Sequence, residues 1–332
     1  MADDTLNTVV RSLASVVRNG SPLVLAAIGE TFTERAGIIN LSLDGSLMLS
    51  ALAGLVIGIN TQSVLIGALA AMIVGMIVAL IVAASSIQLK QNQVAVGFIL
   101  TLLCRDLAIT LGKPFLNVPA LSVLYLPIPI LKDIPVVGPI LFDQDLFTYL
   151  SLIAIVVSWF WIFRTAPGLT LRSVGERPAA TFARGKNVNS IRYLYAAVGG
   201  SLVGLGGAAY TLSVSTIWKE TPNGGQISGN GWIALALVIF GGWYPLRVAF
   251  GVYLVAALRI LAGGLQGGAI PIALLNLIPW LLMILTLLAV SGPYLETLLK
   301  ILPTRLHPLV RSLLRARPPA ALGAVFEQEG KE

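Results

Sequence analysis

The sequence predicts an all-α protein that crosses a membrane several times. The chain of 332 residues is 56% hydrophobic and only 11% charged, whereas a soluble globular domain carries about 25% charged residues. The uncharged positions are also contiguous. Four stretches contain no Asp, Glu, Lys or Arg: 45–89, 193–218, 221–246 and 260–295. Because a helix that spans the hydrocarbon core needs about 20 mostly apolar residues, these stretches have room for several spans.

The apolar runs predict about eight to nine transmembrane helices. The candidate spans are 20–34, 41–59, 63–85, 94–112, 146–163, 190–212, 230–242, 247–262 and 272–290. Three of them, 20–34, 230–242 and 247–262, are short and are therefore candidates for broken or re-entrant helices. A membrane tolerates such helices only where protein or a watery cavity covers the backbone.

We expect three parts along the chain: an N-terminal lead-in (1–20), a transmembrane domain (21–292) and a basic C-terminal tail (293–332). The transmembrane domain is interrupted by a segment, 164–192, with six Lys or Arg residues against one acid. We call 164–192 the basic segment. Since cytoplasmic loops of membrane proteins carry an excess of Lys and Arg, the basic segment is expected in the cytoplasm.

Counting spans from the basic segment orients the rest of the chain. It assigns the C-terminal tail and the loops 86–93 and 243–247 to the cytoplasm, and the loops 113–145 and 213–230 to the outside. The N-terminus fits less well. Nine full spans put Arg11 and Arg18 outside, against the rule, whereas a re-entrant first segment leaves eight spans and a cytoplasmic N-terminus. On the sequence, both arrangements stay open.

The composition excludes several classes of site. Cys104 and His307 are the only cysteine and histidine, so an intrachain disulfide, a Cys-rich metal site and a catalytic triad within the membrane are excluded. No Gly-Lys-Ser or Gly-Lys-Thr motif is present, so we expect the chain itself to bind no ATP, metal or cofactor. The net charge of +7 is explained by basic cytoplasmic loops, and no nucleic-acid partner is expected.

The centre of the basic segment, Ser173 to Ala183, has the composition of a short helix that follows Pro167 and Gly168. Its small apolar face would be formed by Val174, Ala179, Ala180 and Phe182. One interpretation is a solvated loop between two spans. The other is a helix that docks in the groove of a partner protein, which explains why apolar residues lie among the charges. The pattern alone favours neither.

Five stretches resemble a known family in the same order along the chain. The basic segment carries a pattern typical of coupling helices: Arg172, Gly175, Pro178, Ala179, Ala180, Gly185 and Val188. The other four are 29–51 (GETFTERAGIINLSLDGSLMLSA), 89–97 (LKQNQVAVG), 229–246 (GNGWIALALVIFGGWYPL) and 270–289 (IPIALLNLIPWLLMILTLLA). Together they resemble membrane permeases of ATP-binding cassette (ABC) importers of the branched-chain amino acid, ribose and nucleoside group, and most closely the nucleoside and simple-sugar branch. Ser42, Asp44 and Ser46 depart from that branch's pattern, which leaves the substrate open.

The resemblance implies a type II ABC importer-like permease bundle that is a multi-pass protein of a prokaryotic plasma (inner) membrane, with its C-terminus in the cytoplasm. It implies partners of three kinds: cytoplasmic ATPase subunits that use ATP and Mg, a second permease that more often forms a heterodimer than a homodimer, and an extracytoplasmic solute-binding lipoprotein. The implied substrates are nucleosides, with simple sugars second. A secondary transporter or channel without an ATPase is the alternative from another class. Ion coupling would need more intramembrane acids than Asp44 and Asp106.

The resemblance also assigns roles to residues. Coupling to the ATPase is expected of Arg172, Val174, Gly175, Glu176, Pro178, Ala179, Ala180, Phe182 and Gly185. In the transmembrane domain, polar residues in or beside spans are candidates for the substrate pathway. These are Asn40, Asp44, Gln93, Arg105, Asp106, Gln266 and Asn276.

Each pathway candidate has a structural alternative. Asn40 and Asp44 are four residues apart and would share one helix face, but a buried cap or interhelical hydrogen bond would also explain them. Gln93 lies where a helix begins and is also explained by capping. Arg105 and Asp106 point about 100° apart on a helix, so each is expected to face a cavity or a partner helix rather than the other. The two amides near the outer ends of the last spans would bond a solute or a neighbouring helix.

Overall fold

The computed structural model describes residues 2–121, 123, 125–222, 224–264, 281, 284 and 318–326. Within these residues the regular structure is helical, with three isolated β-bridges. In chain order the α-helices are α1 (Ala2–Arg35), α2 (Leu43–Thr61), α3 (Val64–Ile87), α4 (Gln93–Gly112), α5 (Leu146–Arg164), α6 (Ala166–Glu176), α7 (Pro178–Ala183), α8 (Val188–Ala209), α9 (Asn230–Phe240) and α10 (Pro245–Gly264). Short 3₁₀ helices η1 (Lys113–Phe115) and η2 (Leu131–Asp133) and π-helical turns η3 (Gly138–Phe142) and η4 (Tyr210–Val214) lie between them.

Six helical stretches in the described part of the chain are long and apolar enough to cross a membrane. They are Leu43–Thr61, Val64–Ile87, Gln93–Phe115, Leu146–Arg164, Val188–Val214 and Pro245–Gly264. All six coincide with predicted spans, which confirms an all-α, multi-pass membrane protein. The span expected at 247–262 is longer than predicted, because α10 begins at Pro245 and has 20 residues. The span expected at 272–290 lies outside the described residues.

The first helix corrects the sequence-based expectation. The lead-in and the short span 20–34 form one continuous helix, α1, of 34 residues, which at 1.5 Å per residue is about 51 Å long. Pro22 lies inside α1 and cannot donate to the carbonyl of Arg18. The Ser21 hydroxyl donates to that carbonyl instead, at 2.8 Å. α1 is therefore continuous and does not turn back between Ala2 and Arg35.

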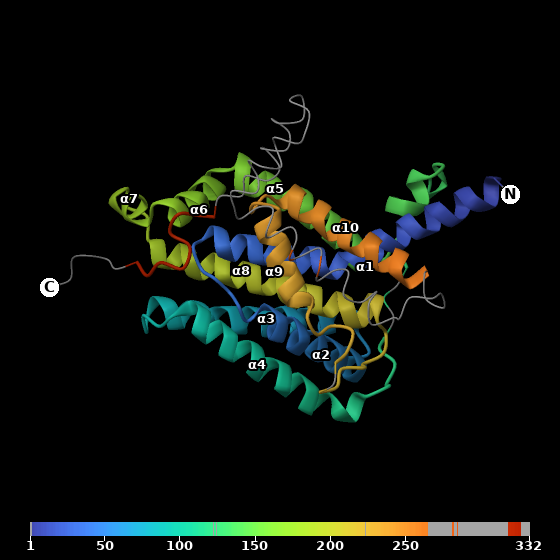
Figure 1. Ribbon diagram of the computed structural model, residues 1–332, viewed down its shortest axis with the longest axis horizontal. Helices are drawn as coiled ribbons and strands as arrows, with labels where there is room; N and C mark the ends of the chain where they lie inside the picture. The colour runs from blue at the N-terminus through green and yellow to red at the C-terminus, as the bar shows by residue number, and fades with distance from the viewer. Residues whose placement is uncertain are drawn as a thin grey trace.

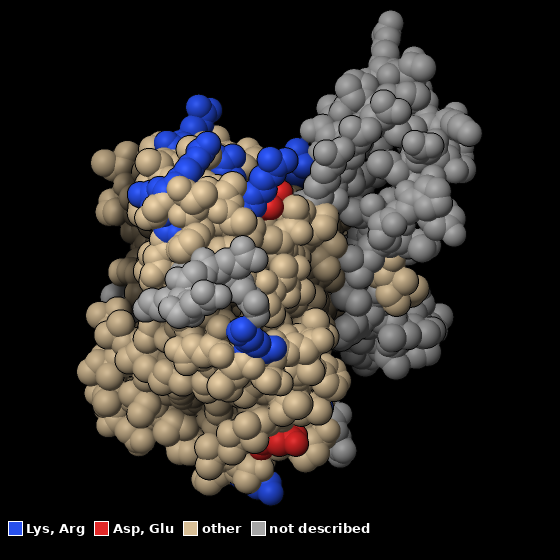
Figure 2. All heavy atoms as spheres, turned by 90° about the vertical axis from the view of Figure 1, so that its left-hand side faces the viewer, with Lys and Arg blue, Asp and Glu red and all other residues tan. Residues whose placement is uncertain are grey.

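The two ends of the bundle carry different loops (Figure 1). We call one of them the α7 end. It holds α6, α7, the turn 241–244, the loop 88–92 and residues 318–326. Arg177, Arg184, Lys186 and Lys90 are exposed here, and Figure 2, which looks onto this end, shows basic side chains gathered over it. The prediction that the basic segment and the loops 86–93 and 243–247 lie at the same end of the bundle is thus confirmed.

The opposite end holds the N-terminal half of α1 together with the loop 113–145. Arg18 pairs with Asp145 at 3.3 Å and donates to the carbonyl of Ser213 at 3.2 Å. Gln144 donates to the carbonyl of Ala14 at 3.3 Å. A basic residue in the N-terminal segment is therefore compatible with this end because an acid of the neighbouring loop pairs with it.

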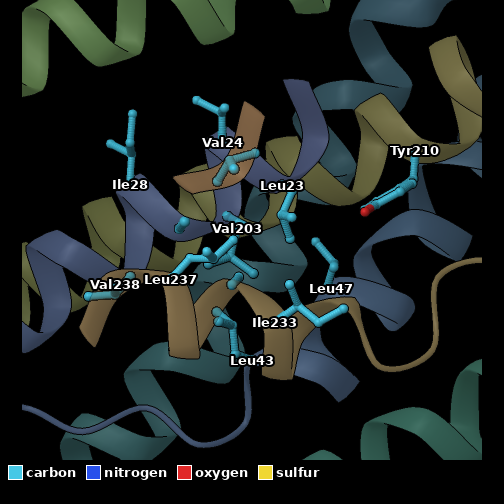
Figure 3. Close-up of a cluster of buried hydrophobic side chains, with 14 of the residues drawn as sticks. Leu23, Val24, Ile28, Leu43, Leu47, Val203, Tyr210, Ile233, Leu237 and Val238 are labelled. Carbon is cyan, nitrogen blue, oxygen red and sulfur yellow. The ribbon is translucent and has the colours of Figure 1, made fainter. Parts of the chain in front are cut away.

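The core lies where α8 packs against α1, α2 and α3. Glycines allow the closest approach: a Cβ at Gly204 would overlap the backbone of α3 at Ala71 and Met72, and a Cβ at Gly200 would fall on Gly75. On the other side of α8 the apolar cluster of Figure 3 joins α1, α2, α8 and α9. Since interhelical packing rather than water drives association in lipid, these small residues fix how the helices are arranged around the site.

Candidate functional site

The N-termini of α2 and α9 meet at Asp44 in the interior of the bundle. Asp44 lies in the first turn of α2 and is 4% exposed. Its Oδ1 accepts backbone hydrogen bonds from Gly229 at 2.8 Å and Gly231 at 2.9 Å. A carboxylate is favourable there because the first N–H groups of a helix lack intrahelical partners and carry partial positive charge. Asp44 therefore caps α9 through these two backbone hydrogen bonds.

α9 is a half-helix. Its 11 residues rise about 16 Å, about half of the ~30 Å hydrocarbon core. The chain reaches its N-terminus through residues 215–229, a stretch held together by Glu220. The Glu220 carboxylate accepts backbone hydrogen bonds from Gln226, Ile227 and Ser228 at 2.6 to 3.4 Å. The prediction that 230–242 is a broken helix is confirmed.

A second non-helical stretch, 36–42, leads into α2 from the α7 end. Asn40 lies in this stretch and not in the helix, so the expected shared helix face with Asp44 is wrong. The Asn40 side-chain oxygen accepts from the Ser42 hydroxyl at 2.5 Å, and its backbone N–H donates to Glu30 at 3.2 Å. Gln93 accepts from the backbone of Ile39 at 2.7 Å and donates to Ser86 on α3 at 2.6 Å. Both amides hold the stretch in place.

Of the remaining pathway candidates, Arg105 is near enough to Asp44 to act on it electrostatically, whereas Asp106 does not join this constellation. Arg105 is half-buried on α4, and Asp106 is exposed on the outer side of the same helix. The two side chains point in different directions, as expected. Gln266 and Asn276 lie outside the described residues. Among the predicted candidates, the structure brings together Asn40, Asp44 and Gln93 around the starts of α2, α4 and α9.

The structure gives partners to two charged residues, Arg259 and Glu34, that were not among the predicted pathway candidates. Arg259 of α10 donates to the side chain of Asn230 at 2.7 Å, and Asn230 in turn donates to the carbonyl of Gln226 at 2.7 Å. At the α7 end, the Trp243 indole N–H donates to Glu34. The sequence marked Arg259 only as a charge within a predicted span. Its partner Asn230 is 29 residues away, so the sequence did not indicate the pair.

The basic segment folds into two helices rather than the single one expected from Ser173 to Ala183. The helix breaks at Arg177 (φ −145°, ψ 77°), because the residue before a proline is disfavoured in the α conformation and Pro178 follows. The break divides the expected apolar face. Val174 is fully buried against the bundle, whereas Ala179, Ala180 and Phe182 on α7 are exposed.

The predicted coupling residues therefore fall into two sets. Arg172, Val174 and Gly175 anchor α6: the Arg172 guanidinium lies over the Phe163 ring at 5.3 Å, and a Cβ at Gly175 would overlap the Arg35 carbonyl. The other set, on or beside α7, faces outward: Glu176, Ala179, Ala180, Phe182 and Gly185 are exposed, and Pro178 is half-exposed.

A groove runs between α6 and α7. Its volume is 290 Å³, and it is lined by Ser173, Glu176, Arg177, Ala180, Thr181 and Arg184. The lining joins one acid and two bases to small side chains, which is a surface suited to a complementary protein segment. The basic segment thus presents a formed groove at the α7 end.

Residues 318–326, which we call the C-terminal strap, bind across this region. Ala321 donates its backbone N–H to Gly175 at 2.8 Å, and Gly323 donates to Gly37 at 3.0 Å. Arg192 of α8, 1% exposed, donates to the Ala324 carbonyl at 3.0 Å. The strap therefore ties α6, α8 and the end of α1 together. The sequence predicted only a basic tail here.

Comparison with known proteins identifies the class. The chain is a multi-pass membrane protein whose residues 12–287 match the family described as branched-chain amino acid transport system, permease component. The match covers most of the chain, and the chain belongs to this family. The resemblance found in the sequence is confirmed, and members of this class are not themselves enzymes.

Individual relatives cover most of their own lengths. The nucleoside ABC transporter permease protein NupC of Lactococcus lactis is 30% identical over 87% of this chain and 95% of its own. The guanosine ABC transporter permease protein NupQ of Bacillus subtilis is 33% identical over 68% of this chain and 73% of its own. TsgC13 of Haloferax volcanii, provisionally named a glucose ABC transporter permease protein, is 35% identical over 75% and 76%. No solved structure gives a significant match.

Proposed function

We propose that the chain is the membrane-spanning permease of an ABC importer and that its solutes are nucleosides. The observation that carries the solute class is the likeness to NupC, which extends over 95% of that nucleoside permease. Uptake of a simple sugar is the second candidate, and the likeness to TsgC13 favours it. The chain would form the pathway and bind neither ATP nor Mg, which a separate ATPase subunit would use.

The orientation follows from the charge of the α7 end. Because Lys and Arg favour the cytoplasmic side, the basic segment and the C-terminal strap would lie in the cytoplasm of a prokaryote, and the protein in its plasma membrane. The groove between α6 and α7 would receive the ATPase. The loops 113–145 and 215–229 would receive the solute-binding lipoprotein. A second, related permease would complete the pathway as a heterodimer.

The mechanism would be a shift between inward-open and outward-open states. A partner can bias such states only through contacts that differ between them. Closure of the ATPases would move α7, and α6 would pass that movement to α1, since Gly175 packs on the Arg35 carbonyl. From α1 it would reach α9, because Arg35 donates two hydrogen bonds to the Trp243 carbonyl, at 3.0 and 3.1 Å. Asp44 caps the N-terminus of α9, so this series of contacts would connect the α7 end with the half-helix α9.

Uptake by vesicles tests the proposal. The permease, its partner permease and the ATPase are reconstituted with the binding lipoprotein, and entry of radiolabelled guanosine or D-glucose is measured with and without ATP. ATP-dependent entry of guanosine supports the proposed function, and entry of D-glucose alone would move the solute class to sugars. Entry in vesicles that lack the ATPase would instead show a secondary transporter or channel.

A further inference from the structure

A cavity of 330 Å³ lies beside the N-terminus of α9, between α1, η4 and α10. Its polar lining consists of Asn19, Tyr210, Ser215, Gln226 and Arg259. Small-molecule sites in proteins occupy about 300 to 1,000 Å³ and combine apolar walls with a few placed polar groups. The volume of this cavity lies within that range, and its lining is of that mixed kind.

Tyr210 is a buried polar side chain whose hydroxyl faces Arg259. It is 5% exposed, and its hydroxyl has no well-formed hydrogen bond within the described part of the chain. In Figure 3 the ring points from η4 into the bundle, toward Leu23. η4 is a π-helical turn, and such turns occur often at functional sites. Because a buried hydroxyl without a well-formed hydrogen bond is unfavourable, Tyr210 is placed to bond a molecule in the cavity.

Arg259 supplies the positive charge of the cavity. It lies on α10, a membrane-spanning helix, where an ionisable residue is a candidate functional group by default. Within the described residues it donates to the neutral Asn230 amide at 2.7 Å and interacts with the Tyr210 hydroxyl, whereas a guanidinium has five N–H donors. Asn230 begins α9, next to the amides that Asp44 caps. A molecule bound by Arg259 would therefore act directly on the start of the half-helix.

The lining also limits the chemistry of the occupant. The described lining residues include no carboxylate, which disfavours a cation. Donors from Arg259 and Tyr210 suit clustered acceptor oxygens, and Leu23, Val255 and Ile260 offer an apolar wall to the face of a ring. We propose that this cavity is the solute site of the permease and that it binds a nucleoside through Arg259 and Tyr210. This inference rests on the proposed function and assigns its residues.

The first test is the KM of ATP-dependent guanosine uptake by the complete reconstituted importer. Arg259→Gln removes a charged donor and is expected to raise the KM about tenfold or more, and Tyr210→Phe about threefold or more, since charge-assisted bonds are the stronger. Tyr253→Phe is the matched control for Tyr210→Phe. Tyr253 lies on α10, as Arg259 does, and its buried hydroxyl has no well-formed hydrogen bond within the described residues. It does not line the cavity. Unchanged KM values for both cavity variants would overturn the proposal.

A second test needs no transport and covers the case in which a variant assembles poorly. Val214→Cys, at a lining position, is made in a Cys104→Ala background, and its reaction with a methanethiosulfonate reagent is timed. Saturating guanosine is expected to slow the reaction and D-glucose to leave it unchanged. The guanosine effect is expected to disappear with Arg259→Gln. Equal rates with and without guanosine, or protection by D-glucose alone, would overturn the nucleoside site.

The two tests separate this proposal from the function on which it rests. If the wild-type importer takes up neither guanosine nor D-glucose in the presence of ATP, the proposed function fails. If it takes up guanosine normally while both cavity variants keep the wild-type KM, the permease function stands and the assignment of the cavity fails.

Discussion

Gly231 donates its backbone N–H to Asp44 over 2.9 Å, and this contact joins two helices that begin 187 residues apart in the sequence. A Cβ at Gly231 would overlap the Asp44 backbone, so the backbones of α2 and α9 are in direct contact at this point. The contact holds α9 where it begins, in the interior of a membrane bundle, where an uncapped helix end would leave backbone N–H groups without water to bond.

Replacement of Asp44 is expected to destabilise the start of α9. Asp44→Ala removes the acceptor for two buried N–H groups, and each unpaired group costs about 1–3 kcal/mol, so the total loss is about 2–6 kcal/mol. The loss is read as a lower midpoint of thermal unfolding in detergent. Asp44→Asn keeps a carbonyl oxygen at the same position and should lose roughly 1 kcal/mol. Equal midpoints for Asp44→Ala and wild type would contradict the cap.

The path of α1 predicts on which side each end of the bundle reacts. In a Cys104→Ala background, Asn7→Cys should react with a membrane-impermeant maleimide in right-side-out vesicles. Lys186→Cys should react only after the vesicles are opened, because the proposed orientation places the basic segment in the cytoplasm. Reaction of both positions from the same side would show that α1 does not cross the membrane. The reverse pattern would invert the orientation.

Charge placed on α7 is expected to uncouple the permease from its ATPase. Ala179 and Ala180 are exposed, and Ala180 lines the groove, so Arg at both positions would obstruct docking without disturbing the bundle. ATP-driven uptake should fall to background while the amount of protein in the membrane stays normal. Gln91→Arg adds charge to an exposed loop at the same end and should leave uptake unchanged. Normal uptake by the double variant would remove α7 from the coupling surface.

The C-terminal strap predicts a contrast between two adjacent alanines. Ala321 is 8% exposed, whereas Ala320 is exposed and points away. Ala321→Arg would bury an unpaired charge and release the strap from Gly175. Amide hydrogen exchange in α6 should then become at least about tenfold faster, which corresponds to about 1.4 kcal/mol of lost local stability. Ala320→Arg should leave exchange near the wild-type rate, and identical rates in both variants would argue against a bound strap.

The spans were predictable because long uncharged runs leave few alternatives. The expected spans 41–59 and 63–85 agree with α2 and α3 within two residues. The break before Pro178 was also open to prediction, because the residue that precedes a proline avoids the helical conformation. The composition of Ser173 to Ala183 suggested one helix, but the constraint that Pro178 places on Arg177 divides it into two.

The roles of the polar residues were harder to predict from the sequence. Asn40 and Asp44 have the spacing of one helix face, but the sequence does not show that Asn40 precedes the helix or that the partner of Asp44 lies on α9. The pairing of Arg18 with Asp145 is likewise a tertiary contact, and it gives Arg18 an acidic partner at the end of the bundle that holds the loop 113–145. Long-range partners of this kind depend on the whole bundle, so a single sequence identifies the candidates but not their bonds.

The C-terminal strap can bind only late in the synthesis of the protein. Residues 318–326 leave the ribosome after every helix of the bundle described here, and domains begin to fold from the N-terminal side during synthesis. Until the strap arrives, Gly175, Gly37 and Arg192 lack the backbone partners that complete the α7 end. The surface at the α7 end, which we propose as the ATPase docking surface, is therefore completed only after the described helices have been synthesised.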